Sequence, residues 1–125
     1  MENYGEYAGA IAKVGADGNP VWHFPVRDFV HSSPIAVPGG GVVCGTNGGE
    51  LVRLSSDGTE LWCSDYGAPI KAGFCYVPET RSVCFGCHDG SFRCVGVDYG
   101  AELWKVETPY VVYSTPAYHR GGVFF

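Results

Sequence analysis

A phrase of 14 or 15 residues occurs three times in this 125-residue chain and limits its fold more than any other feature. Each copy runs from a glycine, through an apolar stretch and a turn, to a tryptophan, and the copies span 9–22, 49–62 and 90–104. Trp22 and Trp62 are 40 residues apart, and Trp62 and Trp104 are 42 apart. A nearly constant period of this length is typical of a repeat protein, in which each repeat is one small structural unit.

Four short strands, named A to D in chain order, are predicted in each period. In the second period they cover 30–37, 41–46, 49–54 and 59–63, and in the third they cover 70–77, 81–86, 90–95 and 101–106. Asn47-Gly48 predicts a two-residue hairpin between B and C, with positive φ at both residues. Four antiparallel strands in about 40 residues predict an all-β fold, the β-propeller, whose blades are four-stranded antiparallel sheets.

The two ends of the chain are expected to be complementary parts of one blade. Residues 105–125 supply a strand A and the start of a strand B, whereas residues 1–22 supply the end of a strand B, then C and D. Counting from Pro116, Phe125 aligns with Val43, and Tyr4 aligns with Cys44. We therefore expect residues 1–125 to form a single propeller segment of about three blades, with one blade split between the termini.

Three blades are fewer than the roughly four to eight of a closed propeller. Open strand edges pair readily with other strands. Two copies joined head to tail would give six blades with two-fold symmetry, and the rest of a longer propeller would serve equally. The close match of the two ends favours the homodimer.

Composition and charge narrow the classes of binding partner and the cellular location that we expect. The formal net charge is −5, and Lys and Arg form no cluster, which disfavours nucleic-acid binding. No apolar run approaches the roughly 20 residues of a membrane span, and the N-terminus lacks the features of a signal peptide. Six cysteines fall mainly within predicted strands, which favours buried free thiols over disulfides. We expect a cytoplasmic protein.

The repeat resembles the pyrroloquinoline-quinone-like (PQQ-like) β-propeller family. The resemblance rests on Ser-Ser-Pro at 32–34, Ser-Thr-Pro at 114–116 and the Asp-Gly-x-x-x-Trp pattern at 57–62. In that family each tryptophan docks against the neighbouring blade, which implies the same role for Trp22, Trp62 and Trp104. An indole suits this role, because it combines a large apolar area with an N–H donor.

The sequence departs from the quinone enzymes of that family. They carry a vicinal disulfide, whereas no two cysteines are adjacent here, and neither their catalytic base nor their calcium ligands can be placed. The third position of strand C, alanine in the strongest form of the docking motif, is Lys13, Arg53 or Cys94. We therefore expect no cofactor and a non-enzymatic scaffold or binding module. The alternative is a piece of a larger PQQ-like oxidoreductase, or of an accessory propeller in a multidomain enzyme.

Two groups of residues are candidates for chemistry or binding. Cys84, Cys87 and His88 have the spacing of a haem-attachment motif or of half a zinc site, but strand alternation sends the two thiols to opposite faces unless the strand bulges. The second group is expected at the mouth of the propeller channel, where it either contacts a ligand or is merely polar lining. Its members are His31, Lys71, Tyr113, Arg27 and Asp28.

Overall fold

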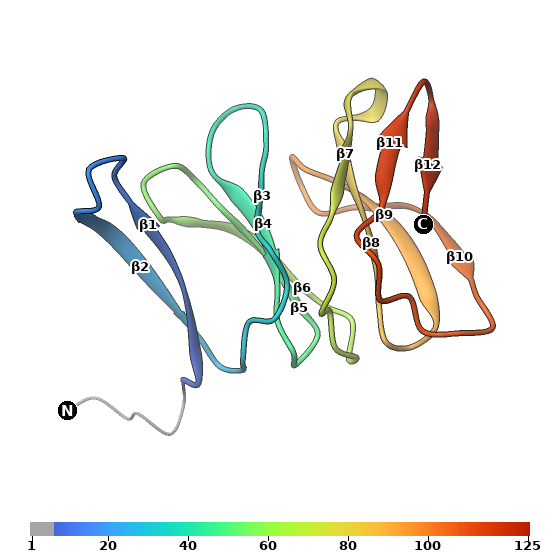
Figure 1. The fold of residues 1–125 in the computed structure, drawn as a ribbon, viewed down its shortest axis with the longest axis horizontal. Coiled ribbons are helices and arrows are strands. Elements are labelled where there is room, and N and C mark those ends of the chain that lie inside the picture. The colour runs from blue at the N-terminus through green and yellow to red at the C-terminus, as the bar shows by residue number, and fades with distance from the viewer. Residues whose placement is uncertain (1–6) are drawn as a thin grey trace.

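The computed structural model describes residues 7–125, which form antiparallel sheets joined by short turns. The complete sheets have the orders β3-β4-β5-β6 and β10-β9-β8-β7, and two-stranded sheets, β1-β2 and β11-β12, lie at the ends (Figure 1). The strands are β1 Gly9–Val14, β2 Pro20–Val26, β3 Ile35–Ala36, β4 Val42–Gly45, β5 Glu50–Leu54, β6 Glu60–Asp65, β7 Cys75–Val77, β8 Ser82–Gly86, β9 Ser91–Gly96, β10 Glu102–Glu107, β11 Ala117–His119 and β12 Gly122–Phe124. A 3-10 turn, η2 Pro78–Thr80, joins β7 to β8.

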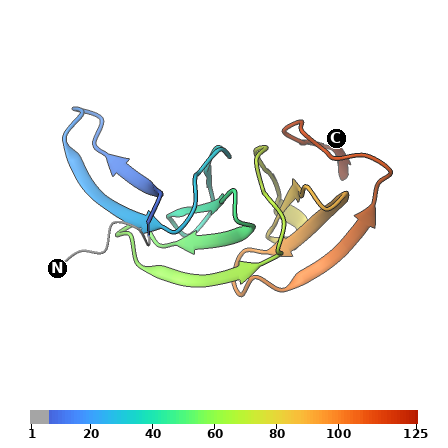
Figure 2. The ribbon, with the colours of Figure 1, turned by 90° about the horizontal axis from the view of Figure 1, so that it is seen from below.

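The sheets stand side by side as an arc, which confirms the predicted all-β fold of four-stranded antiparallel blades. We call them blade 1 (β1–β2), blade 2 (β3–β6), blade 3 (β7–β10) and blade 4 (β11–β12). Strands β2, β6 and β10 follow the convex side of the arc (Figure 2). Among the described residues, blades 1 and 4 each contain half of a strand set, C and D in blade 1 and A and B in blade 4. The described residues contain no helix long and apolar enough to cross a membrane.

Strand A is much shorter than predicted. The expected strand 30–37 contracts to Ile35–Ala36, and 70–77 contracts to Cys75–Val77. In blade 2, the side chain of Ser32 replaces the backbone hydrogen bonds that this part of the strand lacks. Ser32 Oγ accepts a hydrogen bond from the Gly45 N–H at 3.0 Å and donates one to the Gly45 carbonyl at 2.7 Å. Pro34, which lacks an N–H, follows within the same irregular segment.

The predicted conformation of the B–C turn is wrong. Positive φ falls on Gly49, at +98°, and not on Asn47 or Gly48. The Gly49 N–H donates to the Thr46 carbonyl and the Thr46 N–H to Glu50, the pattern of a three-residue hairpin that ends in a left-handed glycine. Gly18, Gly58 and Gly90 take the same conformation at the ends of their turns, with φ of +84°, +87° and +85°.

Strand pairing also corrects the alignment at the C-terminal end. In blade 2 Ile35 is opposite Val43, whereas in blade 4 Ala117 is opposite Phe124. The A–B turn of blade 4 is therefore one residue shorter, and Phe124, rather than Phe125, corresponds to Val43. Tyr4, the predicted counterpart of this end, lies outside the described residues.

The core lies between blades rather than inside one sheet. Each junction contains a strand-B side chain of one blade and a strand-C side chain of the blade before it. Cys44 shares a cluster with Ile11, and Phe85 shares a larger one with Leu51. At the next junction the Phe125 ring stacks on Phe92, with centroids 3.8 Å apart. Burial of these faces is the main force that holds neighbouring blades together.

Candidate functional site

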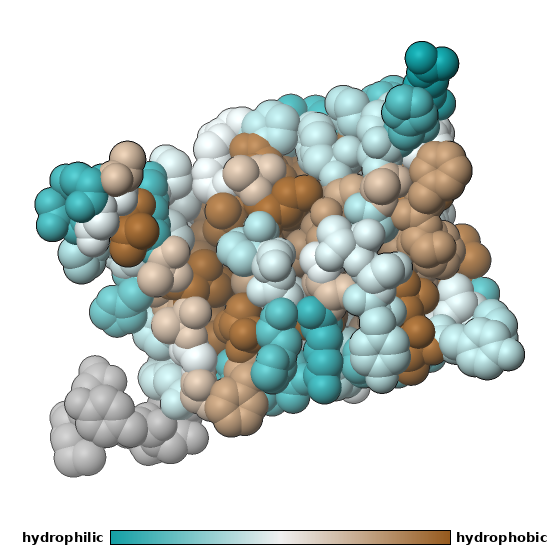
Figure 3. Space-filling model, in the orientation of Figure 1, coloured by the Kyte–Doolittle hydropathy of each residue, from teal (hydrophilic) through white to brown (hydrophobic). Residues whose placement is uncertain are grey.

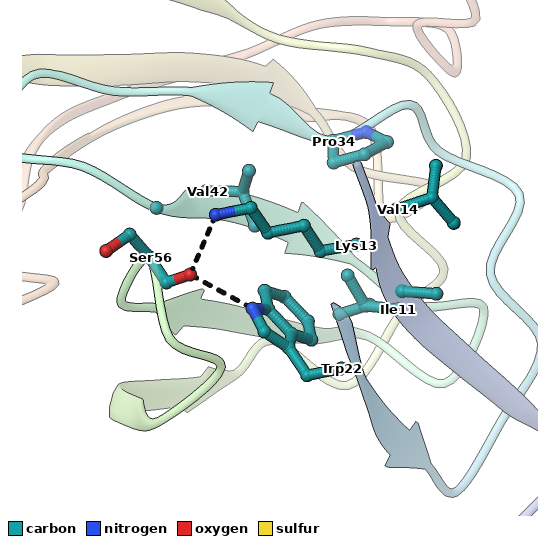
Figure 4. A pocket seen from close by; sticks show the side chains of 9 residues that line it. Ile11, Lys13, Val14, Trp22, Pro34, Val42 and Ser56 are labelled. Carbon is teal, nitrogen blue, oxygen red and sulfur yellow. Dashed lines mark hydrogen bonds between the residues drawn. The ribbon is translucent and has the colours of Figure 1, made fainter. Parts of the chain in front are cut away.

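The blade 1–blade 2 junction contains the first tryptophan. Trp22 lies opposite Lys13 on blade 1, and its indole N–H donates to the Ser56 carbonyl on the C–D turn of blade 2 at 3.0 Å (Figure 4). Lys13 Nζ donates to the same carbonyl at 3.2 Å. The ring lies over Gly58, where a Cβ atom would approach within 2.7 Å of Trp22 Cδ2. Glycine is therefore required at position 58 for space as well as for its positive φ.

The blade 2–blade 3 junction repeats this geometry. The Trp62 indole donates to the Val97 carbonyl at 2.7 Å, and its ring covers Gly100, whose Cβ would meet Trp62 Cε3 at 2.8 Å. Both tryptophans are half-buried. Each thus contacts the C–D turn of the following blade through one hydrogen bond and one glycine.

Trp104 occupies the equivalent position on blade 3, but its surroundings differ. Blade 4 supplies only strands A and B among residues 7–125, so no C–D turn faces this indole. Trp104 is 40% exposed, its indole N–H has no hydrogen-bond partner within the described part of the chain, and its neighbour is the Phe92 ring at 6.1 Å. The docking role inferred for the three tryptophans stays a prediction.

The expected channel-mouth residues lie on the connections that lead from one blade to the next. These connections and the B–C turns follow the lower edge of the arc in Figure 1, and the remaining turns follow the upper edge. The lower edge is tied together by backbone bonds, from the Asn47 N–H to the Phe29 carbonyl at 2.7 Å and from the His88 N–H to the Pro69 carbonyl at 2.9 Å. We call it the loop edge.

The five candidates are mostly exposed there. Arg27, His31, Lys71 and Tyr113 present their side chains to solvent. Asp28 is half-buried, and its carboxylate accepts from the Phe29 N–H at 2.7 Å. No contact between these side chains links all five, so a common ligand site stays a prediction.

A contact that sequence reasoning missed joins the two candidate groups. The His88 ring packs edge-on against Tyr113, with centroids 4.9 Å apart. Burial, followed by the positive charge of Lys71, lowers the pKa of His88. His88 therefore favours the neutral form. It lies at the loop edge, and its sequence spacing to Cys84 and Cys87 does not indicate that its partner is the Tyr113 ring.

The thiols of the Cys84–His88 motif point apart. Cys84 belongs to the core cluster toward blade 4 and Cys87 to the cluster toward blade 2, and both are fully buried. Burial raises the pKa of Cys87, and within residues 7–125 no three His, Cys, Asp or Glu side chains gather as metal ligands would. The two thiols of the motif therefore lie in different clusters, and all six cysteines are free.

An ionic network on blade 3 also escaped the sequence reasoning. Arg93 pairs with Asp89 at 2.9 Å and with Glu102 at 2.6 Å, and its guanidinium carbon lies 4.6 Å from the centre of the Tyr66 ring on blade 2. This mostly buried cation reaches across the blade 2–blade 3 junction. Its carboxylate partners, Asp89 and Glu102, belong to blade 3 and are partly exposed, and only Tyr66 contributes from blade 2.

Comparison with solved structures identifies a protein of similar fold. BamB from Moraxella catarrhalis, a β-propeller, superposes with a TM-score of 0.69 over 83% of this chain at 19% sequence identity. The match covers 32% of the BamB chain, so the present chain spans about a third of that protein's length. No family model matches the sequence, and no curated protein matches it. At this low identity the likeness establishes that the chain folds as part of a β-propeller.

Proposed function

We propose that this chain is a non-enzymatic, PQQ-like β-propeller module whose ring is completed by further blades. The observation that carries the proposal is the pair of open sheet edges. Among the described residues, β1 pairs only with β2 and β12 pairs only with β11, which leaves one edge of each unpaired. Exposed strand edges are a liability in isolated proteins, and closing a propeller ring covers them.

The repeated tryptophan contacts support the PQQ-like assignment. Two of them join consecutive blades through the same pair of interactions, a bond to a turn carbonyl and a ring over a left-handed glycine. In this proposal all three tryptophans dock blades, and the loop edge is the face that contacts a partner protein. The six free cysteines accord with a place in the cytoplasm.

Amide hydrogen exchange tests ring closure. If further blades cover the open edges, amides of β1 and β12 are expected to exchange slowly, at rates like those expected for β4, β5, β8 and β9 inside complete blades. Mass spectrometry of peptic fragments from the purified protein measures both groups in one experiment. Fast exchange confined to β1 and β12 would mean that the arc stays open, and ring closure would then be wrong.

A further inference from the structure

We propose that the strands completing the ring come from a second copy of this chain, so that β12 of one copy pairs with β1 of the other and Trp104 docks on the partner's Gly18 turn. Two such composite blades, one at each junction between copies, would close a dimer. This inference rests on the proposed ring closure and names what closes it.

The register of the composite blade follows from the two complete blades. Strand B pairs with strand C through Val43 and Arg53 in blade 2, and through Cys84 and Cys94 in blade 3. Arg53 and Cys94 are also the residues opposite their blade's tryptophan, and on blade 1 that place belongs to Lys13. Since Phe124 corresponds to Val43, the pairing across copies sets Phe124 opposite Lys13. Val123 then lies opposite Val14, and Phe125 opposite Ala12.

The open edges of β1 and β12 carry exposed apolar side chains at positions that are buried in the complete blades. Val14 is 61% exposed and Phe124 is 63% exposed. Their counterparts in the complete blades, Leu54 and Val43, are fully buried. Apolar surface gathers near β12 at the C-terminal end of the arc (Figure 3). Pairing of the edges would bury these side chains as the internal blades bury theirs, at roughly 25 cal/mol per Å² of apolar area.

A groove beside β1 is placed to receive the Phe124 ring. Its volume is about 390 Å³, and it lies between blade 1 and the A and B strands of blade 2 (Figure 4). Ile11, Lys13, Trp22, Pro34 and Val42 line it. Inside the arc, the strand-B residue equivalent to Phe124 packs toward the following blade, as Val43 does in the cluster it shares with blade 3. A strand added to β1 in the inferred register would direct Phe124 into this groove.

The unmatched tryptophan and the unmatched turn fit each other. Gly18 has the left-handed φ of Gly58, +84° against +87°, yet no atom of the described residues lies within 4 Å of a Cβ atom built on it. Trp104 has the position of Trp22 and Trp62 without their partner turn. By the internal pattern, the Trp104 indole would donate to the Ala16 carbonyl of the second copy and cover Gly18. Each half of the contact is present on one chain, and two copies complete it.

The first test is the mass of the assembled 125-residue protein. Native mass spectrometry and light scattering at micromolar concentration are expected to give twice the 13.4 kDa chain mass. A monomer, or any other stoichiometry, would overturn the inference. Combined with the exchange experiment, the result separates two failures. A monomer with slow exchange at β1 and β12 would refute only the proposal that a second copy closes the ring. A monomer with fast exchange at β1 and β12 would refute ring closure itself.

A glycine pair tests the proposed contact. In the isolated arc, Gly18→Ala and Gly39→Ala introduce the same kind of strain, because both glycines have positive φ and neither Cβ would meet an atom of residues 7–125 within 4 Å. In the dimer, only the Cβ at position 18 collides with Trp104 of the partner. Gly18→Ala and Trp104→Ala are expected to raise the dimer dissociation constant at least about tenfold, and Gly39→Ala to leave it unchanged. Equal dissociation constants for the two glycine variants would refute the contact.

The strand pairing has its own matched variants. Phe124→Asp places a charge at the inferred interface, whereas Leu61→Asp places one at a similarly exposed apolar site on β6, inside blade 2. The first is expected to give monomers and the second to remain dimeric. Amides of β1 should exchange faster in Phe124→Asp than in the wild type. A dimer that survives Phe124→Asp with unchanged β1 exchange would show that the copies meet elsewhere.

Discussion

At the residue scale, the glycines and tryptophans of the repeat form one device. A left-handed glycine ends each C–D turn. In blades 2 and 3 the tryptophan of the preceding blade packs on that glycine. Glycine leaves both the conformational freedom and the space for the ring. The pairing explains why the two residues recur together in sequence, although they contact partners from different repeats.

Replacement of Trp62 by alanine is expected to cost about 3 kcal/mol of unfolding free energy, the low end of the range for buried aromatics, because the ring is half-buried. The variant loses the bond to Val97 and the packing on Gly100. Urea unfolding followed by circular dichroism measures the loss. Leu61→Ala, at an exposed neighbour, serves as the control. A loss no larger than that of the control would contradict the docking role.

At the element scale, strand A depends on a side chain. The segment before β3 lacks ladder bonds, and Ser32 supplies both a donor and an acceptor to Gly45 on β4. Strand β3 is only two residues long, so this serine extends the attachment of the inner strand to its blade. The Ser-Ser-Pro segment at 32–34 is therefore an irregular strand that is fastened by a hydroxyl.

Ser32→Ala is expected to destabilise the protein by about 1–3 kcal/mol, since it leaves buried backbone groups of Gly45 without partners. Ser33→Ala provides a matched control, because Ser33 is exposed. Differential scanning calorimetry of both variants against the wild type is the measurement. If the two variants melt together, the serine–backbone bonds contribute little.

The B–C turn of blade 3 contains a carboxylate, Asp89, that makes the stability of the fold depend on pH in the acidic range. Burial acts to raise the pKa of Asp89, but the hydrogen bonds from Ser91 and Arg93 outweigh it and lower the pKa to about 2. The unfolded value is about 3.9. The carboxylate therefore stabilises the fold above about pH 4, and this contribution is lost as the pH falls toward about 2.

Asp89→Asn is expected to flatten the dependence of unfolding free energy on pH in that window. Denaturant unfolding of wild type and variant between pH 2 and pH 5 measures the two slopes. The variant should be less stable than the wild type at pH 6, with the difference shrinking toward pH 2. Parallel curves would mean that Asp89 keeps an ordinary pKa.

At the scale of the whole molecule, the reactivity of the cysteine thiols shows whether the blade junctions stay closed. Five of the six cysteines are buried, and only Cys63 is exposed. Partial burial, then the nearby carboxylate of Glu50, raises the pKa of Cys63 to about 11. Little of this thiol is ionised at pH 8, so even the accessible cysteine reacts slowly.

Titration with a thiol reagent at pH 8 should label one cysteine in the folded protein and six after denaturation. The labelled cysteine should react more slowly than free cysteine, and Cys63→Ser should abolish labelling of the folded state. Labelling of further cysteines at the same rate would show that the blade junctions open. Labelling of none would show that Cys63 is covered.

The period of the repeat, the four-stranded blades and the approximate strand positions could be predicted from the sequence, because alternation, turn residues and tryptophan spacing are local signals. The residue at which strand A begins and the position of the positive φ could not be predicted. Ser32 satisfies a backbone in another strand, and the left-handed residue is set by the hairpin as a whole. The same limit applied to Arg93 and His88, whose partners Tyr66 and Tyr113 lie in other repeats.

The sequence by itself determined that this protein is built from propeller blades, since three in-register copies of one phrase require three copies of one unit. Only the tertiary structure decided which surfaces those units bury against each other. Among residues 7–125, it covered Gly58 and Gly100 with indoles, left Gly18 bare, and left the edges of β1 and β12 unpaired. The physical reason is that a blade buries its faces on its neighbours, and the identity of a neighbour is a property of the assembled arc.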